Sequence, residues 1–116
     1  MFIQTIIESA KLVGINSYLL LGLCTVETNL KNVINHNDGN SHSYGLCQLK
    51  LETVRRFYPT VKAKYLMLPE VNAYFAAKYL KHQLKRYKGD VNKAVSAYNA
   101  GTFSTKNKKY VAKVHE

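Results

Sequence analysis

A stripe of apolar side chains between residues 73 and 87 constrains the fold of this chain more than any other feature. The stripe consists of Ala73, Ala77, Leu80, Leu84 and Tyr87, which are four, three, four and three residues apart. This spacing puts all of them on one face of an α-helix, so the segment predicts a helix that packs against a core. Pro69 suits the first turn of that helix, and Gly89 suits its end.

Capping residues and glycines predict further helices on both sides of this one. We expect them over residues 2–14, 18–30, 51–57 and 91–101, with Asn16 or Ser17 capping the second and Asp90 capping the last. The tail from residue 102 is expected to be a basic loop with a last helical turn or two. No segment alternates at strand period for long and no linker divides the chain. The sequence therefore predicts one all-α domain over residues 1–116.

Residues 32–45 are rich in asparagine, serine and glycine and predict a long loop, a feature that is often functional in a compact domain. Asp38 lies within the string NDGN, which is typical of a turn. His36 and His42 could bring a metal to this loop together with Asp38. Asparagine and serine dominate the segment, however, so we expect no metal site.

The formal net charge of +10 predicts an anionic partner: nucleic acid, a membrane surface or an acidic polymer such as a bacterial cell wall. Basic residues crowd the C-terminal half, at Lys78, Lys81, Lys85, Arg86, Lys88, Lys106, Lys108, Lys109 and Lys113. The sequence contains no helix-turn-helix, zinc-finger or RNA-recognition string, so a nucleic-acid partner ranks second.

Cys24 and Cys47 are too few for a disulfide framework and show neither CxxC nor zinc-ligand spacing. We favour two buried core thiols, with a sulfur-lined pocket as the alternative and their pairing left open. Residues 18–26 are apolar but too short to span a bilayer. The N-terminus lacks the features of a signal peptide, so action outside a cytoplasm would require another means of delivery.

Glu27 is the single acidic residue in the otherwise apolar helical string LCTVETNL. Cys24, Leu23 and Leu20 precede it by three, four and seven residues and share its helical face. Burial at the edge of a core would raise the pKa of this carboxyl. A carboxylic acid that is protonated near neutral pH can donate a proton to a glycosidic oxygen. The alternatives are an exposed helix-end glutamate or a pair with Lys31.

Two further strings carry polar groups whose chemistry suits the sugar substrate of such an acid. SYGLCQL, residues 43–49, contains Gln48, whose carboxamide both donates and accepts hydrogen bonds and so suits amino sugars. SAYNAG, residues 96–101, puts the phenol of Tyr98 beside the carboxamide of Asn99 near the end of a helix.

Together the three strings resemble the soluble lytic transglycosylase (SLT) family, which shares its core with goose-type lysozyme. The family pattern is a helix ending in Glu-Ser, a loop, Gly-Leu-Met-Gln, a long helix and Ala-Tyr-Asn-Ala-Gly. This chain has Glu27-Thr28, the string GLCQ over residues 45–48, and AYNAG over 97–101, in the same order. The resemblance covers nearly the whole chain. It implies a lysozyme-like helical domain with a long active-site loop after the catalytic helix.

The resemblance also implies cleavage of peptidoglycan between N-acetylmuramic acid and N-acetylglucosamine, leaving 1,6-anhydro ends, with no cofactor and no metal. By position, Glu27 would be the single general acid/base. Gln48 would line the sugar site, Tyr98 would hydrogen-bond near the glutamate and the sugar, and Asn99 would help to hold that region. Tyr44 is expected to be a substrate contact because it lies beside Gly45.

An ordinary glycosidase needs two carboxylates. Glu52 and the other glutamates are expected on helix exteriors or at the terminus, which leaves Asp38 as the sole candidate partner of Glu27 in a cleft. Two alternatives remain open: a hydrolysing lysozyme on the same fold, and a catalytically inactive basic module that binds nucleic acid or wall. The small size fits a phage-encoded or secretion-system-associated enzyme that acts at the cell wall alongside virion or secretion-system proteins.

Overall fold

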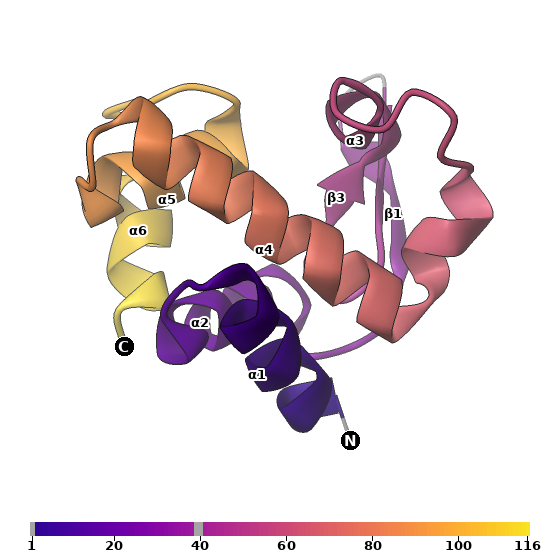
Figure 1. Cartoon of the computed structure of the whole chain (residues 1–116). Coiled ribbons are helices and arrows are strands. Elements are labelled where there is room, and N and C mark those ends of the chain that lie inside the picture. Colours follow the sequence, from indigo (N-terminus) through magenta and orange to yellow (C-terminus); the bar gives the residue numbers. More distant parts are fainter. Residues whose placement is uncertain (1, 39–40) are drawn as a thin grey trace.

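Helix α4, Pro69–Arg86, is the long helix that the apolar stripe predicts, and it crosses the middle of the molecule (Figure 1). The computed structural model describes residues 2–38 and 41–116, without the side chains of residues 37, 38 and 41. Pro69 begins the helix, and Ala73, Ala77 and Leu80 are fully buried. Leu84 packs partly buried against the core, whereas Tyr87 lies one residue beyond the helix, so the stripe packs as predicted over its first four residues.

The other predicted helices are present, and the mainly helical fold class is confirmed. The side chain of Asn16 caps α2 by accepting from two backbone N–H groups, and that of Asp90 caps α5 by accepting from the backbone N–H of Lys93. The 3₁₀-helix η1 was not predicted, and the tail forms a defined helix, α6. The bounds are α1 Phe2–Val13, α2 Ser17–Thr28, α3 Leu51–Arg55, η1 Ala63–Met67, α5 Val91–Ala100 and α6 Lys108–Val114.

The prediction of a long loop over residues 32–45 is wrong for most of its length. Strands β1, Ile34–Asp38, and β2, Ser41–Tyr44, form an antiparallel hairpin, and β3, Leu49–Lys50, pairs with β2 on its other side. The described side chains of β1 are exposed, so no apolar alternation marks the strand. Backbone pairing across the hairpin, which composition does not reveal, holds this sheet together.

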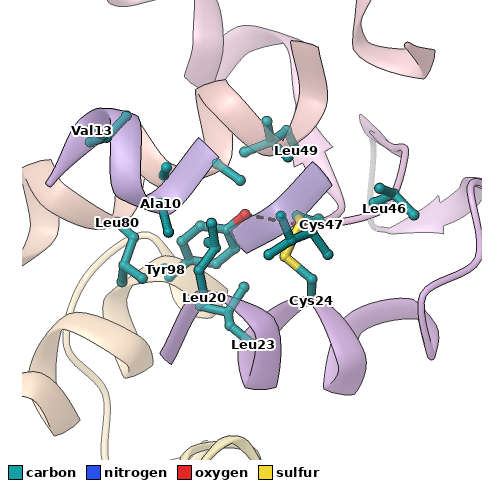
Figure 2. Packing of buried hydrophobic residues seen from close by; sticks show 14 of the residues in the cluster. Ala10, Val13, Leu20, Leu23, Cys24, Leu46, Cys47, Leu49, Leu80 and Tyr98 are labelled. Atoms are coloured by element: carbon teal, nitrogen blue, oxygen red, sulfur yellow. Dashed lines mark hydrogen bonds between the residues drawn. A yellow bond between two sulfur atoms is a disulfide. The ribbon is translucent and has the colours of Figure 1, made fainter. Parts of the chain in front are cut away.

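The helices and the sheet form two groups joined by α4. Figure 1 shows the sheet and α3 beside one part of α4, and α5 and α6 beside its other end. Helix α1 packs against α2 and α4, and α6 packs against α2 and α5. The core between them includes Ile6, Leu20, Leu23, Leu80 and Val95, all fully buried. Figure 2 shows Leu20, Leu23 and Leu80 within this cluster. Within the described residues, no helix is both long and apolar enough to cross a bilayer.

Candidate active site

Glu27 lies in the last turn of α2, half-buried, on the wall of a groove of about 270 Å³. We call this the Glu27 groove. Gln48, Tyr98 and Asn99 line the same groove, so the fold brings all three sequence strings together. The four side chains come from the end of α2, the turn after β2 and the end of α5. These elements are far apart in sequence and meet because they pack around one end of the core.

The turn over residues 45–48 is fixed by a buried asparagine that the sequence did not single out. Asn72, fully buried on α4, donates through Nδ2 to the carbonyls of Tyr44 and Leu66, both at 2.8 Å. Its Oδ1 accepts from the backbone N–H of Cys47 at 2.9 Å. This one side chain thus pairs with three backbone groups. Each of those groups would cost free energy if it were buried without a hydrogen-bond partner.

Gly45 is required at the start of this turn for two reasons. Its φ of +79° lies in the region that side chains disfavour. A Cβ atom there would also overlap Nδ2 of Asn72 and lie 2.5 Å from the carbonyl oxygen of Leu66. The glycine therefore allows α4 and η1 to approach the turn closely.

Cys24 and Cys47 form a disulfide, so the favoured expectation of two core thiols is wrong. The bond joins α2, one helical turn before Glu27, to the turn that carries Gln48. Thr28 connects the same two elements, because its hydroxyl donates to the carbonyl of Leu46 at 2.7 Å. The pairing escaped prediction because it depends on tertiary placement, whereas a sequence separation of 23 residues carries no signal of it.

Tyr98 lines the groove, and its hydroxyl is bonded within the protein. Its side chain is 6% exposed, and its hydroxyl donates to the carbonyl of Cys47 at 2.8 Å (Figure 2). Burial, with a smaller contribution from the charge of Glu27, raises the pKa of this phenol well above its ordinary value. Tyr98 therefore stays protonated and holds the turn in place beside the disulfide.

Tyr110, on α6, contributes a phenol that contacts the acid. Its hydroxyl donates to Oε2 of Glu27 at 2.7 Å. Burial first, and then the charge of Glu27 and this hydrogen bond, raise the pKa of Tyr110, so the phenol remains a donor. Tyr110 was not predicted as a site residue, because the lysines of the tail favour a basic loop. Val111 and Val114 follow Tyr110 at helical spacing. They could have indicated a helix whose apolar face packs against the core.

Gln48 and Asn99 line the groove while also making contacts within the protein. Gln48 Nε2 donates to the carbonyls of Val33, at 3.1 Å, and Gly45, at 3.0 Å. Asn99 is exposed, and its Oδ1 accepts from Nδ2 of Asn107 at 3.0 Å. Both carboxamides are therefore oriented before any ligand binds.

Tyr44 is not among the described residues that line the groove. Its ring packs partly buried against the core, with the ring of His42 edge-on at 6.3 Å between centroids. His36 lies 4.9 Å from His42, but the part of the chain described contains no group of three potential metal ligands. The side chain of Asp38 lies outside the described residues, so its expected role in a turn stays a prediction.

Glu52 corrects the expectation that the remaining glutamates face away from the cleft. It lies in the first turn of α3 and lines the Glu27 groove together with Arg56. Helical position alone suggested an exterior residue, and Glu52 is indeed exposed, but the exterior of α3 here forms the groove wall. The groove thus contains a second carboxylate.

A comparison with known protein families identifies one match. The pattern of the family described as Transglycosylase SLT domain matches residues 4–115, nearly the whole chain. Among curated proteins, no sequence matches the chain significantly. The family match implies a transglycosylase-type activity on the peptidoglycan of the cell wall. The chain belongs to the SLT transglycosylase domain family.

Proposed function

We propose that this chain is a peptidoglycan lytic transglycosylase in which Glu27 is the single general acid/base. The bond cleaved would be the β-1,4 bond between N-acetylmuramic acid and N-acetylglucosamine. The observation that carries the proposal is the hydrogen bond from Tyr110 to Glu27, whose side chain lines the groove where the three strings meet. This bond fixes the rotation of a carboxyl group that a catalytic proton transfer requires to be well oriented.

The proposed reaction needs one carboxyl group and no water. Glu27 donates its proton to the glycosidic oxygen, the bond from C1 to that oxygen breaks, and the acetamido oxygen of the substrate stabilises C1. The carboxylate then accepts the proton of the muramyl C6 hydroxyl while this oxygen bonds to C1. The product is a 1,6-anhydro ring, and Glu27 regains its proton.

Tyr98 and the disulfide contribute indirectly to this reaction. They hold the turn that carries Gln48, through the carbonyl and the sulfur of Cys47 respectively. The part of the groove wall that carries Gln48 thereby keeps its shape as the leaving sugar separates. Delivery to the wall, by virion or secretion-system proteins, is part of the same proposal.

A hydrolysing lysozyme is the second candidate, and Glu52 is the observation that favours it. A carboxylate on the groove wall could activate a water molecule, as the second carboxylate does in inverting glycosidases. The two candidates predict different products from the same groove. They also predict different consequences of removing the charge of Glu52.

The test is a digest of purified peptidoglycan, with the products identified by mass spectrometry. Wild type, Glu27→Gln and Glu52→Gln are compared with Glu70→Gln, which removes an exposed carboxylate outside the groove. We expect anhydro ends from all except Glu27→Gln, which should lose on the order of 100-fold or more in rate. Reducing ends that disappear in Glu52→Gln would establish hydrolysis instead. A binding module would be established if the wild type showed no cleavage and bound wall or nucleic acid with the same affinity as Glu27→Gln.

A further inference from the structure

A second cavity, of about 410 Å³, adjoins the Glu27 groove between α3 and α4. Thr53 and Tyr79 line both, so the cavity and the groove are immediate neighbours on the surface. We call it the aromatic cavity. The side chains that define its character are Phe57, Tyr58, Phe75, Tyr79, Lys78 and Lys85.

Two of the rings that line this cavity are exposed rather than packed into the core. Phe57 is 46% exposed and Tyr58 is 37% exposed. Phe57 meets the ring of His82 edge-on at 5.0 Å, and Tyr58 meets Phe75 at 4.8 Å. These contacts give the cavity an ordered apolar surface that remains open to a ligand.

The charge of the cavity is positive. Lys78 and Lys85 lie seven residues apart on α4, and none of the described residues that line the cavity is acidic. The ammonium group of Lys78 lies 5.9 Å from the centroid of Tyr74, a cation–π contact that steadies it. Lys81 also lines the cavity, but its Nζ donates to the carbonyl of Val13 at the end of α1. Lys78 and Lys85 are therefore the cations best able to meet an anionic ligand.

We propose that the aromatic cavity binds the acidic peptide attached to the muramic acid of the substrate. The proposal rests on the proposed function, because it assumes that a peptidoglycan strand occupies the adjoining groove. The peptide branch carries carboxylates together with small apolar side chains, which matches lysines beside aromatic rings. The sugar chain itself offers few charges to such a surface. The cavity would thus select strands that carry peptides over bare glycan.

The experiment measures binding in a Glu27→Gln background, so that no substrate is consumed. The ligands are soluble peptidoglycan fragments with peptides and the same fragments after an amidase has removed them. Lys78→Gln combined with Lys85→Gln should lower the affinity for the peptide-bearing fragments on the order of 10-fold and leave bare glycan unchanged. Phe57→Ser should lower the same affinity several-fold, because it removes one exposed ring.

Lys88→Gln combined with Lys113→Gln is the matched control, because it removes the same charge outside the cavity. Equal losses in both double variants, or equal losses for both ligands, would overturn the proposal. So would a loss confined to a single-stranded oligonucleotide used as a third ligand, which would indicate a nucleic-acid surface. Failure of the proposed reaction would appear separately, as a wild-type digest without glycosidic cleavage, and would leave the binding comparison measurable.

Discussion

The turn over residues 45–48 and helix α6 both contribute to the surroundings of Glu27, but they are held by different kinds of bonds. A disulfide, the buried carboxamide of Asn72 and the hydroxyl groups of Thr28 and Tyr98 fix the turn. Most of these partners lie in the core. Several backbone groups of the turn are therefore hydrogen-bonded to buried partners, and water has no access to take the place of those partners.

Helix α6 depends on bonds nearer the surface. Asn107, just before the helix, donates to the carbonyl of Ser96 at 3.0 Å, and the hydroxyl of Ser96 donates to Oδ1 of Asn107 at 2.7 Å. Val114 packs closely over Gly22. A Cβ atom added to Gly22 would lie 2.5 Å from the carbonyl oxygen of Val114. Each such hydrogen bond contributes about 1 kcal/mol, since water competes for partly exposed groups.

This difference in bonding suggests that the turn and α6 meet two separate requirements of the site. The turn provides fixed geometry, and a change there should cost stability before it affects chemistry. Helix α6 provides the donor that contacts the acid, through Tyr110, and a change there should affect chemistry with little cost in stability. The predictions below test this division, beginning with the largest effect.

Gly45→Ala should have the largest effect on stability. The substitution combines a positive φ with overlap against Asn72 and Leu66, so we expect a loss of about 3–5 kcal/mol or failure to fold. Gly89→Ala is the control, because its φ of +85° is similar but no atom lies within 4 Å of the added Cβ. That variant should lose only about 1 kcal/mol in urea unfolding. Similar losses in the two variants would mean that the close approach at the turn contributes nothing.

Removing the disulfide should have the next largest effect. The bond closes a loop with a sequence separation of 23 residues, so Cys24→Ala combined with Cys47→Ala should lose about 3 kcal/mol in the free energy of unfolding. Added reductant should destabilise the wild type by a similar amount and leave the double variant unchanged. If the reduced wild type, with both thiols titratable, unfolds at the same denaturant concentration as the oxidised protein, the turn does not depend on this bond.

The features that the sequence predicted are those with a local cause. Helix α4 followed from the spacing of its apolar residues, and the cap of α5 followed from Asp90. Gln48 and Asn99 were singled out with Glu27 because their strings matched a family pattern, and all of them line one groove. Local sequence patterns of this kind predict the structure correctly where the tertiary contacts favour the same conformation.

The features that the sequence missed depend on contacts between distant segments. Asn72 is one polar residue in a helix, and only the fold brings it against the turn. Arg86 was counted with the basic surface, yet it donates to the carbonyl of Gly101 at 3.0 Å and to the hydroxyl of Thr102. The exposed position of Glu52 was foreseen, whereas its place on the groove wall required knowing where α3 packs. In each case the residue type is ordinary and its surroundings supply the role.

Tyr110→Phe should have the smallest effect on stability and a clear effect on catalysis. It removes one donor to Glu27 and keeps the ring in place, so we expect a loss of about 1 kcal/mol or less in unfolding. The rate of glycan cleavage should fall on the order of 10-fold, because the carboxyl group loses a hydrogen bond that orients it. Tyr18→Phe, which changes a largely exposed phenol, is the control and should leave both quantities unchanged.

A titration separates this positioning role from a general effect on packing. Because the pKa of Tyr110 is raised, its phenol should stay neutral where ordinary tyrosines ionise, near about pH 10. The phenolate absorbance of wild type and of Tyr110→Phe should therefore rise by equal amounts through that range. A smaller rise in the variant would show that Tyr110 ionises like an exposed tyrosine. A phenol that ionises so readily would not be buried against the acid, and α6 would then have no part in orienting Glu27.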